Sequence, residues 1–374
     1  MRPNGDPTSF NESFQEARQR ATDFGRETQE RASQIFREAQ ERALELARQR
    51  AQEAQDRARR AADAMPPGLL VRLTSSMLGI PLLFVLVFAE GPQRVAALPF
   101  TCAVAICALV GGWELFRGLK LRGFRPSEGP AFTAIFLLEF AAWSVSRFQA
   151  DKLLPALIAL LVIGTLIHQV MRRDPEPLAN IGVTFLGVVY VGWLFSYLIF
   201  LRSLPGHVDM PGLSHFATTV LGRTPAGPFI NDLSHAATGT WMVLYVFAVT
   251  WSTDAGAYFF GMRFGKHQLA PRLSPKKTVE GALGGLVAST LMSLLWGSWI
   301  GLAWYHCLFL GPVLGALGQV GDLCESALKR DLGIKDFGTL LPGHGGILDR
   351  FDSLFFTAPI AYYYLTLIVP HLHG

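Results

Sequence analysis

The sequence predicts an all-α polytopic membrane protein with about nine transmembrane helices, preceded by a long amphipathic cytoplasmic helix. Half of the 374 residues are hydrophobic and 17% are charged, whereas about a quarter of the residues of a soluble protein are charged. After Met65 the chain consists of long apolar runs, each close to the roughly 20 residues that cross a bilayer. Lys and Arg gather in alternate connections between these runs, which is the pattern of a membrane protein with fixed orientation.

Three regions are expected along the chain. Residues 1–65 are charged and rich in Ala, Arg, Glu and Gln, and they lack the apolar core of a cleavable signal sequence. Residues 66–250 contain the first transmembrane helices and an external loop, and residues 251–374 contain a transmembrane region rich in charged motifs. The four cysteines lie in or beside apolar runs without Cys-x-x-Cys spacing, so neither a disulfide framework nor a zinc site is expected.

The first region has a period of eleven residues, seen in Phe10, Ala21, Ala32, Ala43 and Ala54. Eleven residues in three turns give a nearly straight helix. Its apolar face is mostly alanine, so two interpretations stay open besides disorder. One is a solvated helix or weak coiled coil, and the other is a helix that lies on the membrane surface.

Basic residues follow the second, fourth, sixth and eighth apolar runs, so these connections are expected in the cytoplasm. The N-terminus is then cytoplasmic and the C-terminus external. The external loop from Arg202 to Ala236 contains three widely spaced histidines, which we interpret as ordinary loop residues. The expected spans are residues 69–89, 95–116, 130–148, 152–171, 179–201, 237–260, 280–302, 304–325 and 353–370.

An acidic residue inside an expected span is costly and suggests function, and Glu114, Glu139 and Asp254 are such residues. Glu114 is close to a basic connection, so simple ion pairing competes with a functional role. Glu139 would serve as a buried hydrogen-bonding group or in a helix–helix contact. Asp254 lies near the cytoplasmic end of the sixth span, among small residues that permit close backbone approach.

The stretch after the sixth span predicts a phosphate contact. Ser274 is expected to cap a helix with Pro275 in its first position. Lys276, Lys277 and Thr278 would then occupy the first turn, where free N–H groups favour an anion. The competing interpretation is that both lysines only set the orientation of the chain.

A second charged stretch begins at the end of the eighth span. Helical spacing places Asp322, Ser326, Lys329 and Arg330 near one face, and Gly333 is expected to end the helix. If the chain folds back on itself, Asp322 and Asp349 would hold Mg²⁺, which usually takes one or two protein carboxylates. The residues that would neutralise the remaining phosphate charge are Lys329, Arg330, Lys335 and Arg350.

The order and spacing of these residues resemble a known family. The pattern consists of Ser326-x-Leu328-Lys329-Arg330, Lys335-Asp336-x-Gly338 and Pro342-x-His344-Gly345-Gly346-x-x-Asp349-Arg350-x-Asp352. It resembles the signature of phosphatidate cytidylyltransferases, also called CDP-diacylglycerol synthases. The run from Asp254 to Gly281 is similar to a second block of that family, with Val279 at a position where an aromatic or other apolar residue is common.

The resemblance implies that phosphatidic acid attacks the α-phosphorus of CTP in the presence of Mg²⁺, giving CDP-diacylglycerol and pyrophosphate for phospholipid biosynthesis. It implies that the protein lies in a bacterial cytoplasmic membrane and that Asp322 and Asp349 are metal ligands. A second cation in the site stays open. The implied catalytic residues are Lys329, Arg330, Lys335, Asp349 and Arg350. The implied substrate-binding residues are Asp254, Ser274, Lys276, Lys277, Thr278, Ser326 and His344. For His344 a contact that shapes the glycine turn or meets a phosphate competes with a role as general base, which an already ionised lipid phosphate does not need.

Other functions stay open from the sequence alone. They are a CTP-dependent kinase of the polyprenol-kinase type, a cytidylyltransferase for another lipid phosphate, and a transporter of anionic solutes. The expected partners are CTP, phosphatidic acid and the lipid bilayer. No nucleic acid is expected, and the sequence leaves homodimer formation open.

Overall fold

The computed structural model describes residues 69–88, 97–148, 152–172, 176–206, 238–338, 340 and 345–369. The helix expected over residues 1–65, most of the expected external loop and His344 lie outside these residues. The chain from Leu70 onward forms one compact unit. The expected boundary between residues 250 and 251 stays a prediction.

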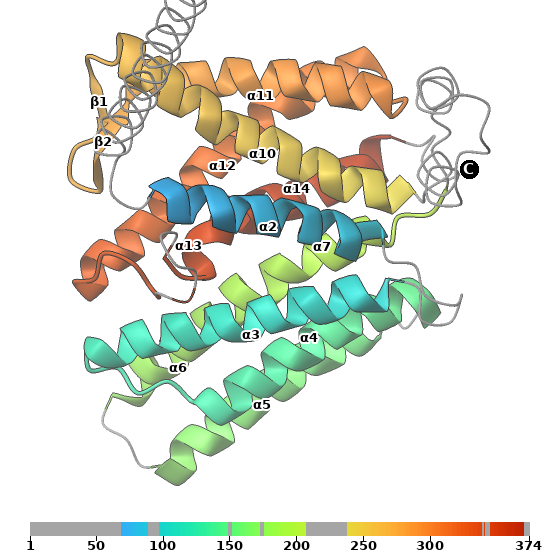
Figure 1. The fold of residues 1–374 in the computed structure, drawn as a ribbon. Helices are drawn as coiled ribbons and strands as arrows, with labels where there is room; N and C mark the ends of the chain where they lie inside the picture. The colour runs from blue at the N-terminus through green and yellow to red at the C-terminus, as the bar shows by residue number, and fades with distance from the viewer. Residues whose placement is uncertain are drawn as a thin grey trace, which may run out of the picture. The chain divides into compact units, whose positions relative to one another are not determined.

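Helices make up nearly all of the described structure (Figure 1). They are α2 (Leu69–Phe88), α3 (Leu98–Leu121), α4 (Glu128–Phe148), α5 (Leu153–Arg172), α6 (Pro177–Gly187), the π-helix η2 (Val188–Trp193), α7 (Leu194–Arg202), α10 (Thr238–Phe264), α11 (Val279–Trp299), α12 (Trp304–Leu332), α13 (Leu348–Phe351) and α14 (Leu354–Ile368). The segments α6, η2 and α7 follow one another without a break.

The protein is an integral membrane protein. Five of the described helical segments are long and apolar enough to cross a bilayer, namely Leu98–Leu121, Leu153–Arg172, Pro177–Arg202, Val279–Trp299 and Trp304–Leu332. Every expected span overlaps a described helix. That all nine of them cross the membrane stays a prediction.

A small hairpin interrupts the helices between α10 and α11. Strand β1 (Gln268–Ala270) pairs antiparallel with β2 (Ser274–Thr278). The predicted helix start at Ser274 is therefore wrong, because α11 begins at Val279. Thr278 is the N-cap instead, and its side-chain oxygen accepts a hydrogen bond of 3.1 Å from the Gly281 N–H.

Glu280 explains why the helix starts there. Its carboxylate, in the first turn of α11, accepts hydrogen bonds from the backbone N–H groups of Lys266 and His267, at 3.0 and 3.2 Å. It also bonds the His267 ring at 2.6 Å. These contacts tie the beginning of β1 to the beginning of α11, which leaves Ser274 and Pro275 in the extended strand between them.

Helices α10 and α11 pack closely through small residues. A Cβ atom at Gly256 would lie 2.8 Å from the Gly284 carbonyl oxygen, and one at Gly284 would overlap Phe260. Close backbone approach through glycine is typical of helix contacts in membranes. Further along the pair, the Tyr245 hydroxyl bonds the Ser293 hydroxyl at 2.5 Å. This packing fixes the position at which the hairpin emerges.

Four connections lie at the same end of the helices, at the left in Figure 1. They are the α3–α4 connection, the α5–α6 connection, the hairpin between α10 and α11, and the α12–α13 connection. These are the four connections that the sequence identifies as basic. The basic connections of the described chain therefore gather at one end of the unit.

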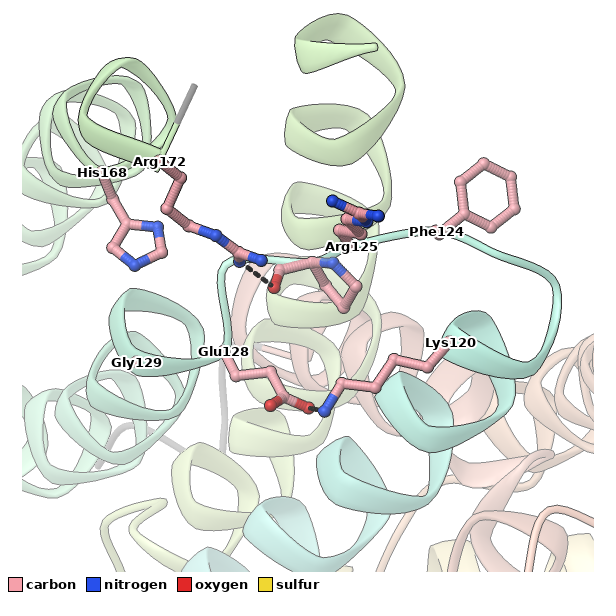
Figure 2. A pocket seen from close by; sticks show the side chains of 8 residues that line it. Lys120, Phe124, Arg125, Glu128, Gly129, His168 and Arg172 are labelled. Atoms are coloured by element: carbon pink, nitrogen blue, oxygen red, sulfur yellow. Dashed lines mark hydrogen bonds and ion pairs between the residues drawn. The ribbon is translucent and has the colours of Figure 1, made fainter. Parts of the chain in front are cut away.

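The α3–α4 connection is held by hydrogen bonds to its neighbours (Figure 2). The Arg125 N–H donates to the Asn180 side chain at 2.8 Å, and the Ser127 N–H donates to Thr184 Oγ1 at 2.9 Å. From α5, Arg172 donates to the Pro126 carbonyl oxygen at 3.2 Å. The connection is thereby fixed against both α5 and α6.

Candidate active site

The C-terminal end of α12 carries most of the predicted site residues. The helix ends where expected, because Gly333 adopts a left-handed conformation with φ of 71°. Asp322, Ser326 and Lys329 all lie in its last three turns. The side chains of Asp322 and Lys329 contact Lys277 of β2 and Asp349 of α13.

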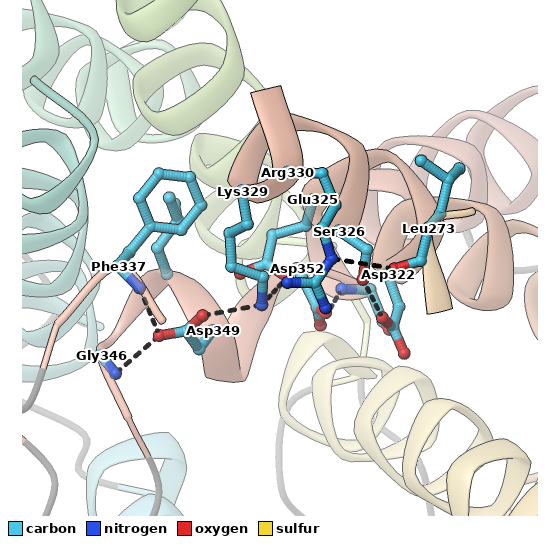
Figure 3. A network of polar contacts seen from close by, with 12 residues as sticks. Leu273, Asp322, Glu325, Ser326, Lys329, Arg330, Phe337, Gly346, Asp349 and Asp352 are labelled. Atoms are coloured by element: carbon cyan, nitrogen blue, oxygen red, sulfur yellow. Dashed lines mark hydrogen bonds and ion pairs between the residues drawn. The ribbon is translucent and has the colours of Figure 1, made fainter. Parts of the chain in front are cut away.

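Lys329 is held between two carboxylates (Figure 3). Its Nζ lies 2.5 Å from Glu325 Oε2, one helical turn earlier, and 2.9 Å from Asp349 Oδ1. The lysine side chain is 15% exposed, and those of Glu325 and Asp349 are 1% and 4% exposed. Two of the three ammonium donors are thus used, and the cation is fixed in place rather than extended into solvent.

Asp349 organises the loop before α13. Its Oδ2 accepts hydrogen bonds from the Phe337 N–H at 3.0 Å and from the Gly346 N–H at 2.8 Å. Burial raises the pKa of the Asp349 carboxyl, but the neighbouring Glu325 carboxyl, the Gly346 N–H and Lys329 outweigh burial and hold its pKa below the ordinary value. Asp349 is therefore an ionised anchor for one lysine and for two backbone segments.

Glu114 holds the same loop from the other side. This fully buried residue of α3 accepts hydrogen bonds from the Ile347 N–H at 3.2 Å and the Leu348 N–H at 2.9 Å. A Cβ atom at Gly338 or at Gly346 would overlap the Glu114 carboxylate. The two glycines of the motif therefore make room for a side chain that is more than 220 residues away along the chain.

The hairpin contributes a second set of contacts. Lys277 of β2 forms an ion pair with Asp322 of α12. Ser326 Oγ donates to Asp322 Oδ1 at 3.4 Å, and Arg330 Nε donates to the Leu273 carbonyl oxygen at 3.3 Å. The structure thus brings the Ser274–Thr278 strand and the end of α12 together, as the charge pattern predicts.

Three carboxylates form an acidic group at this place. One oxygen from each of Asp322, Glu325 and Asp352 lies within 4.8 Å of the others. Burial and the charge of Asp322 raise the pKa of Asp352 to about 7, and Asp254 of α10 adds to this effect. Among the residues that the structure describes, Glu325 Oε1 is buried and has no hydrogen-bond partner.

The acidic group differs from the predicted pair of Asp322 and Asp349. Both Asp349 oxygens bond Lys329 and backbone N–H groups, and the acidic group contains Glu325 and Asp352 in its place. The sequence offered a signal for Glu325, which stands four residues before Lys329 on the same helix face. For Glu114 the signal was only its acidic charge inside an expected span, because its partners are backbone groups of a distant loop.

The remaining predicted residues surround these contacts. Asp254 interacts electrostatically with Asp322, Lys277 and Arg350. Thr278 is the N-cap of α11, and Ser274 is half-buried on β2. The exposed cations of the site are Lys276, Arg330, Lys335 and Arg350. The arrangement combines fixed lysines, exposed cations and an acidic group, which suits an anionic ligand together with a divalent cation.

Comparisons with known proteins identify sequences similar to this chain. The profile of the cytidylyltransferase family matches residues 70–368. The phosphatidate cytidylyltransferase of Synechocystis sp. is 35% identical over 307 residues, covering 81% of this chain and 98% of that protein. The phosphatidate cytidylyltransferase of Bacillus subtilis is 34% identical over 300 residues, covering 79% and 96%. That of Staphylococcus aureus is 48% identical over 124 residues, covering 33% and 48%.

Proposed function

The chain belongs to the cytidylyltransferase family, and from this premise we propose that it transfers the CMP moiety of CTP to phosphatidic acid. The products are CDP-diacylglycerol, a precursor in phospholipid biosynthesis, and pyrophosphate. The observation that carries the proposal is similarity along nearly the full length of a relative that bears this activity in its name. The matched region includes every described residue of the candidate active site.

The reaction places clear demands on the site. An oxygen of the lipid phosphate attacks the α-phosphorus of CTP, the bond to the oxygen that bridges to the β-phosphorus breaks, and pyrophosphate leaves with the electron pair. The lipid phosphate is already ionised near neutral pH, so no general base is required. Catalysis of this kind depends on positioning and on neutralising negative charge.

The residues of the site meet these demands as follows. Lys329, fixed by Glu325 and Asp349, presents its charge in one place without reorganisation during the reaction. The exposed cations of the site contact the triphosphate and the lipid phosphate from the hairpin, α12 and the loop before α13. They are Lys276, Arg330, Lys335 and Arg350, with Ser274, Ser326 and His344 as further contacts.

A magnesium ion fits the acidic group. Carboxylate oxygens are the ligands that Mg²⁺ prefers. The three oxygens lie within 4.8 Å of one another, whereas two oxygens of one octahedral shell lie at most about 4.2 Å apart, so the carboxylates would draw slightly together around the ion. Asp322 and Asp352 would hold the ion, and the unpartnered Glu325 oxygen would complete the protein ligands. When bound, Mg²⁺ neutralises and orients the triphosphate oxygens. Asp349 supports this site by holding Lys329 and the loop, and the arrangement leaves a second cation open.

The orientation follows from charge. The four basic connections lie at one end of the unit, and the positive-inside rule assigns this end to the cytoplasm. The active site is at the same end, where soluble CTP reaches it and phosphatidic acid arrives from the bilayer. We assign the protein to the bacterial cytoplasmic membrane, with nine spans and a cytoplasmic N-terminus.

The function is tested with purified protein, phosphatidic acid, Mg²⁺ and CTP labelled either in cytosine or in the γ-phosphate. We expect cytosine label in the lipid product and γ-label in released pyrophosphate. Lipid labelled only from the γ-phosphate would identify a lipid kinase instead, and an absence of turnover in folded protein would contradict enzymatic activity. A polyprenyl phosphate and an ether-linked phosphatidic acid serve as competing acceptors.

The metal assignment is tested with Asp352→Asn. We expect the Mg²⁺ concentration for half-maximal activity to rise at least about tenfold, because one of the proposed ligands loses its charge. Asp331→Asn is the matched control, since Asp331 is exposed on the same end of α12 and lies outside the acidic group. An unchanged Mg²⁺ requirement in Asp352→Asn would remove this residue from the metal site.

A further inference from the structure

A cavity of about 430 Å³ lies at the end of α3, α4 and α5 where the basic connections gather (Figure 2). Its walls include Lys120 at the end of α3, Arg125 in the α3–α4 connection, and His168 and Arg172 at the end of α5. Glu128, at the start of α4, is the acidic residue of the lining. The candidate active site uses none of these residues.

The cavity has an excess of positive charge. Lys120, Arg125 and Arg172 contribute three cations against the one carboxylate of Glu128, so the lining carries a net formal charge of +2 with His168 neutral. Glu128 pairs with Lys120 at 2.6 Å. Arginine and lysine in such a group bind an anion with several oxygens, above all a phosphate.

The walls are held by specific contacts. His168 Nδ1 bonds the hydroxyl of Ser127 at 3.0 Å, and Arg172 donates to the Pro126 carbonyl oxygen at 3.2 Å. The Ser127 side chain is fully buried, and its N–H donates to Thr184. The connection that closes the cavity is therefore anchored at Pro126 and Ser127. Lys120 is held by Glu128, and Arg172 is held by the Pro126 carbonyl oxygen, before a ligand arrives.

A second, apolar groove of about 350 Å³ lies between α4 and α5. Its lining includes Ala134 and Leu138 of α4 and Leu157, Leu161 and Gly164 of α5. On α4 the polar lining ends at Gly129 and the apolar lining begins at the next residue. On α5, Gly164 stands one helical turn before His168. The two cavities are thus adjacent along both helices.

The groove has the dimensions of an acyl-chain site. From Pro130 to Leu138 the helix rises about 12 Å, which approaches half of the roughly 30 Å hydrocarbon core of a bilayer. Only 17% of the membrane-spanning window of α5 is buried within the protein, so most of this helix is accessible from the bilayer. A free phosphate would leave the groove unused, whereas a lipid fills both parts.

We propose that the basic cavity and the apolar groove form one binding site for an anionic phospholipid, separate from the active site. The phosphate of the headgroup lies against Lys120, Arg125 and Arg172, and one acyl chain lies between α4 and α5. The inference does not depend on the proposed reaction, because the site shares no lining residue with the candidate active site.

The headgroup contacts are tested by native mass spectrometry. Delipidated full-length protein in detergent is titrated with dioleoyl phosphatidylglycerol or with dioleoyl phosphatidylcholine. We expect preferential binding of the anionic lipid and about tenfold weaker binding of it by Arg125→Gln/Arg172→Gln, since two basic contacts are lost. Arg117→Gln/Arg122→Gln removes two exposed arginines outside the cavity and should bind like the unsubstituted protein. Equal binding by the two double variants would overturn the proposal.

The acyl-chain contact is tested with Gly164→Leu. A side chain at Gly164 points into open space, so leucine fills the groove without an internal clash. We expect about tenfold weaker binding of phosphatidylglycerol, whereas Gly182→Leu, which also enters open space but on α6, should have no effect.

Inorganic phosphate serves as a second probe. Unchanged lipid binding by Gly164→Leu, with phosphate competing fully, would identify a site for free anions and overturn the proposal. A loss of dimer mass in Gly164→Leu with unchanged lipid binding would assign this face to contact between copies and would also overturn it.

Discussion

Glu114 and Glu139 are the same residue type in neighbouring helices, and both are fully buried, but their surroundings differ completely. Glu114 of α3 accepts two backbone hydrogen bonds from the loop before α13. Glu139 of α4 has no hydrogen-bond partner for either carboxylate oxygen among the residues that the structure describes. Burial alone therefore does not distinguish a carboxylate that holds part of the site from one without hydrogen-bond partners.

The difference shows what an acidic residue inside a membrane helix must have in order to support a function. A buried carboxylate is costly, and only specific donors offset that cost. At Glu114 the donors belong to the segment that carries Asp349, which in turn fixes Lys329. The carboxylate of α3 thus acts on the site through the backbone, although it does not contact the acidic group itself.

The largest effect is expected from Glu114→Ala. The substitution leaves the N–H groups of Ile347 and Leu348 without acceptors, and each buried donor without a partner costs about 1–3 kcal/mol. The loop will move to find new partners, which displaces Asp349 and releases Lys329. We expect cytidylyl transfer to fall by about a hundredfold, measured as cytosine label entering the lipid.

Glu139→Ala is the matched control, because it removes the same side-chain atoms from an equally buried position. It should retain activity within about threefold, since no donor is known to lose its partner there. Glu114→Gln should fall between wild type and Glu114→Ala, because its amide oxygen still accepts one N–H. Equal activity losses in the two alanine variants would show that general packing, and not the loop contact, is responsible.

The sequence predicted the helices well because each is an apolar run that ends at a local signal. The run expected over residues 304–325 continues to Leu332, where Gly333 ends it. The hairpin was missed because a five-residue polar strand containing Pro275 has no periodicity that distinguishes it from a helix start. The start of α11 is instead fixed by the cap at Thr278 and by the hydrogen bonds of Glu280 with the preceding loop.

The sequence predicted those site contacts that lie along one helix, but not those between segments that are far apart in the chain. The positions of Asp322, Ser326 and Lys329 on α12 follow from helical spacing. The contacts of Asp349 with the N–H groups of Phe337 and Gly346 involve backbone atoms, which leave no side-chain pattern in the sequence. Only the folded chain shows that Asp349 bonds the loop and that Asp352 joins the acidic group.

A smaller effect is expected from Gly338→Ala, which sharpens the role of Glu114. The added methyl group would overlap the Glu114 carboxylate. The carboxylate accepts two hydrogen bonds, and it cannot move aside without weakening them. We expect activity to fall about tenfold. In a Glu114→Ala background the same substitution should have a much smaller effect, because the overlap with the carboxylate is gone and only the Gly346 Cα atom, at 3.1 Å, remains close. Gly182→Ala, where the methyl group meets open space, controls for the loss of glycine. Additive losses in the double variant would mean that Gly338 and Glu114 act independently.

The smallest effect is expected from Glu139→Gln. A neutral amide costs less to bury than a carboxylate, and no described partner of Glu139 depends on its charge. Activity should therefore stay within about twofold of wild type, and the thermal unfolding midpoint in detergent should stay the same or rise by a few degrees, which corresponds to about 1 kcal/mol. The same variant shows whether Glu139 acts in catalysis after all. An activity loss of about tenfold or more at an unchanged unfolding midpoint would mean that this carboxylate has a partner in the working enzyme, and the contrast with Glu114 would then no longer hold.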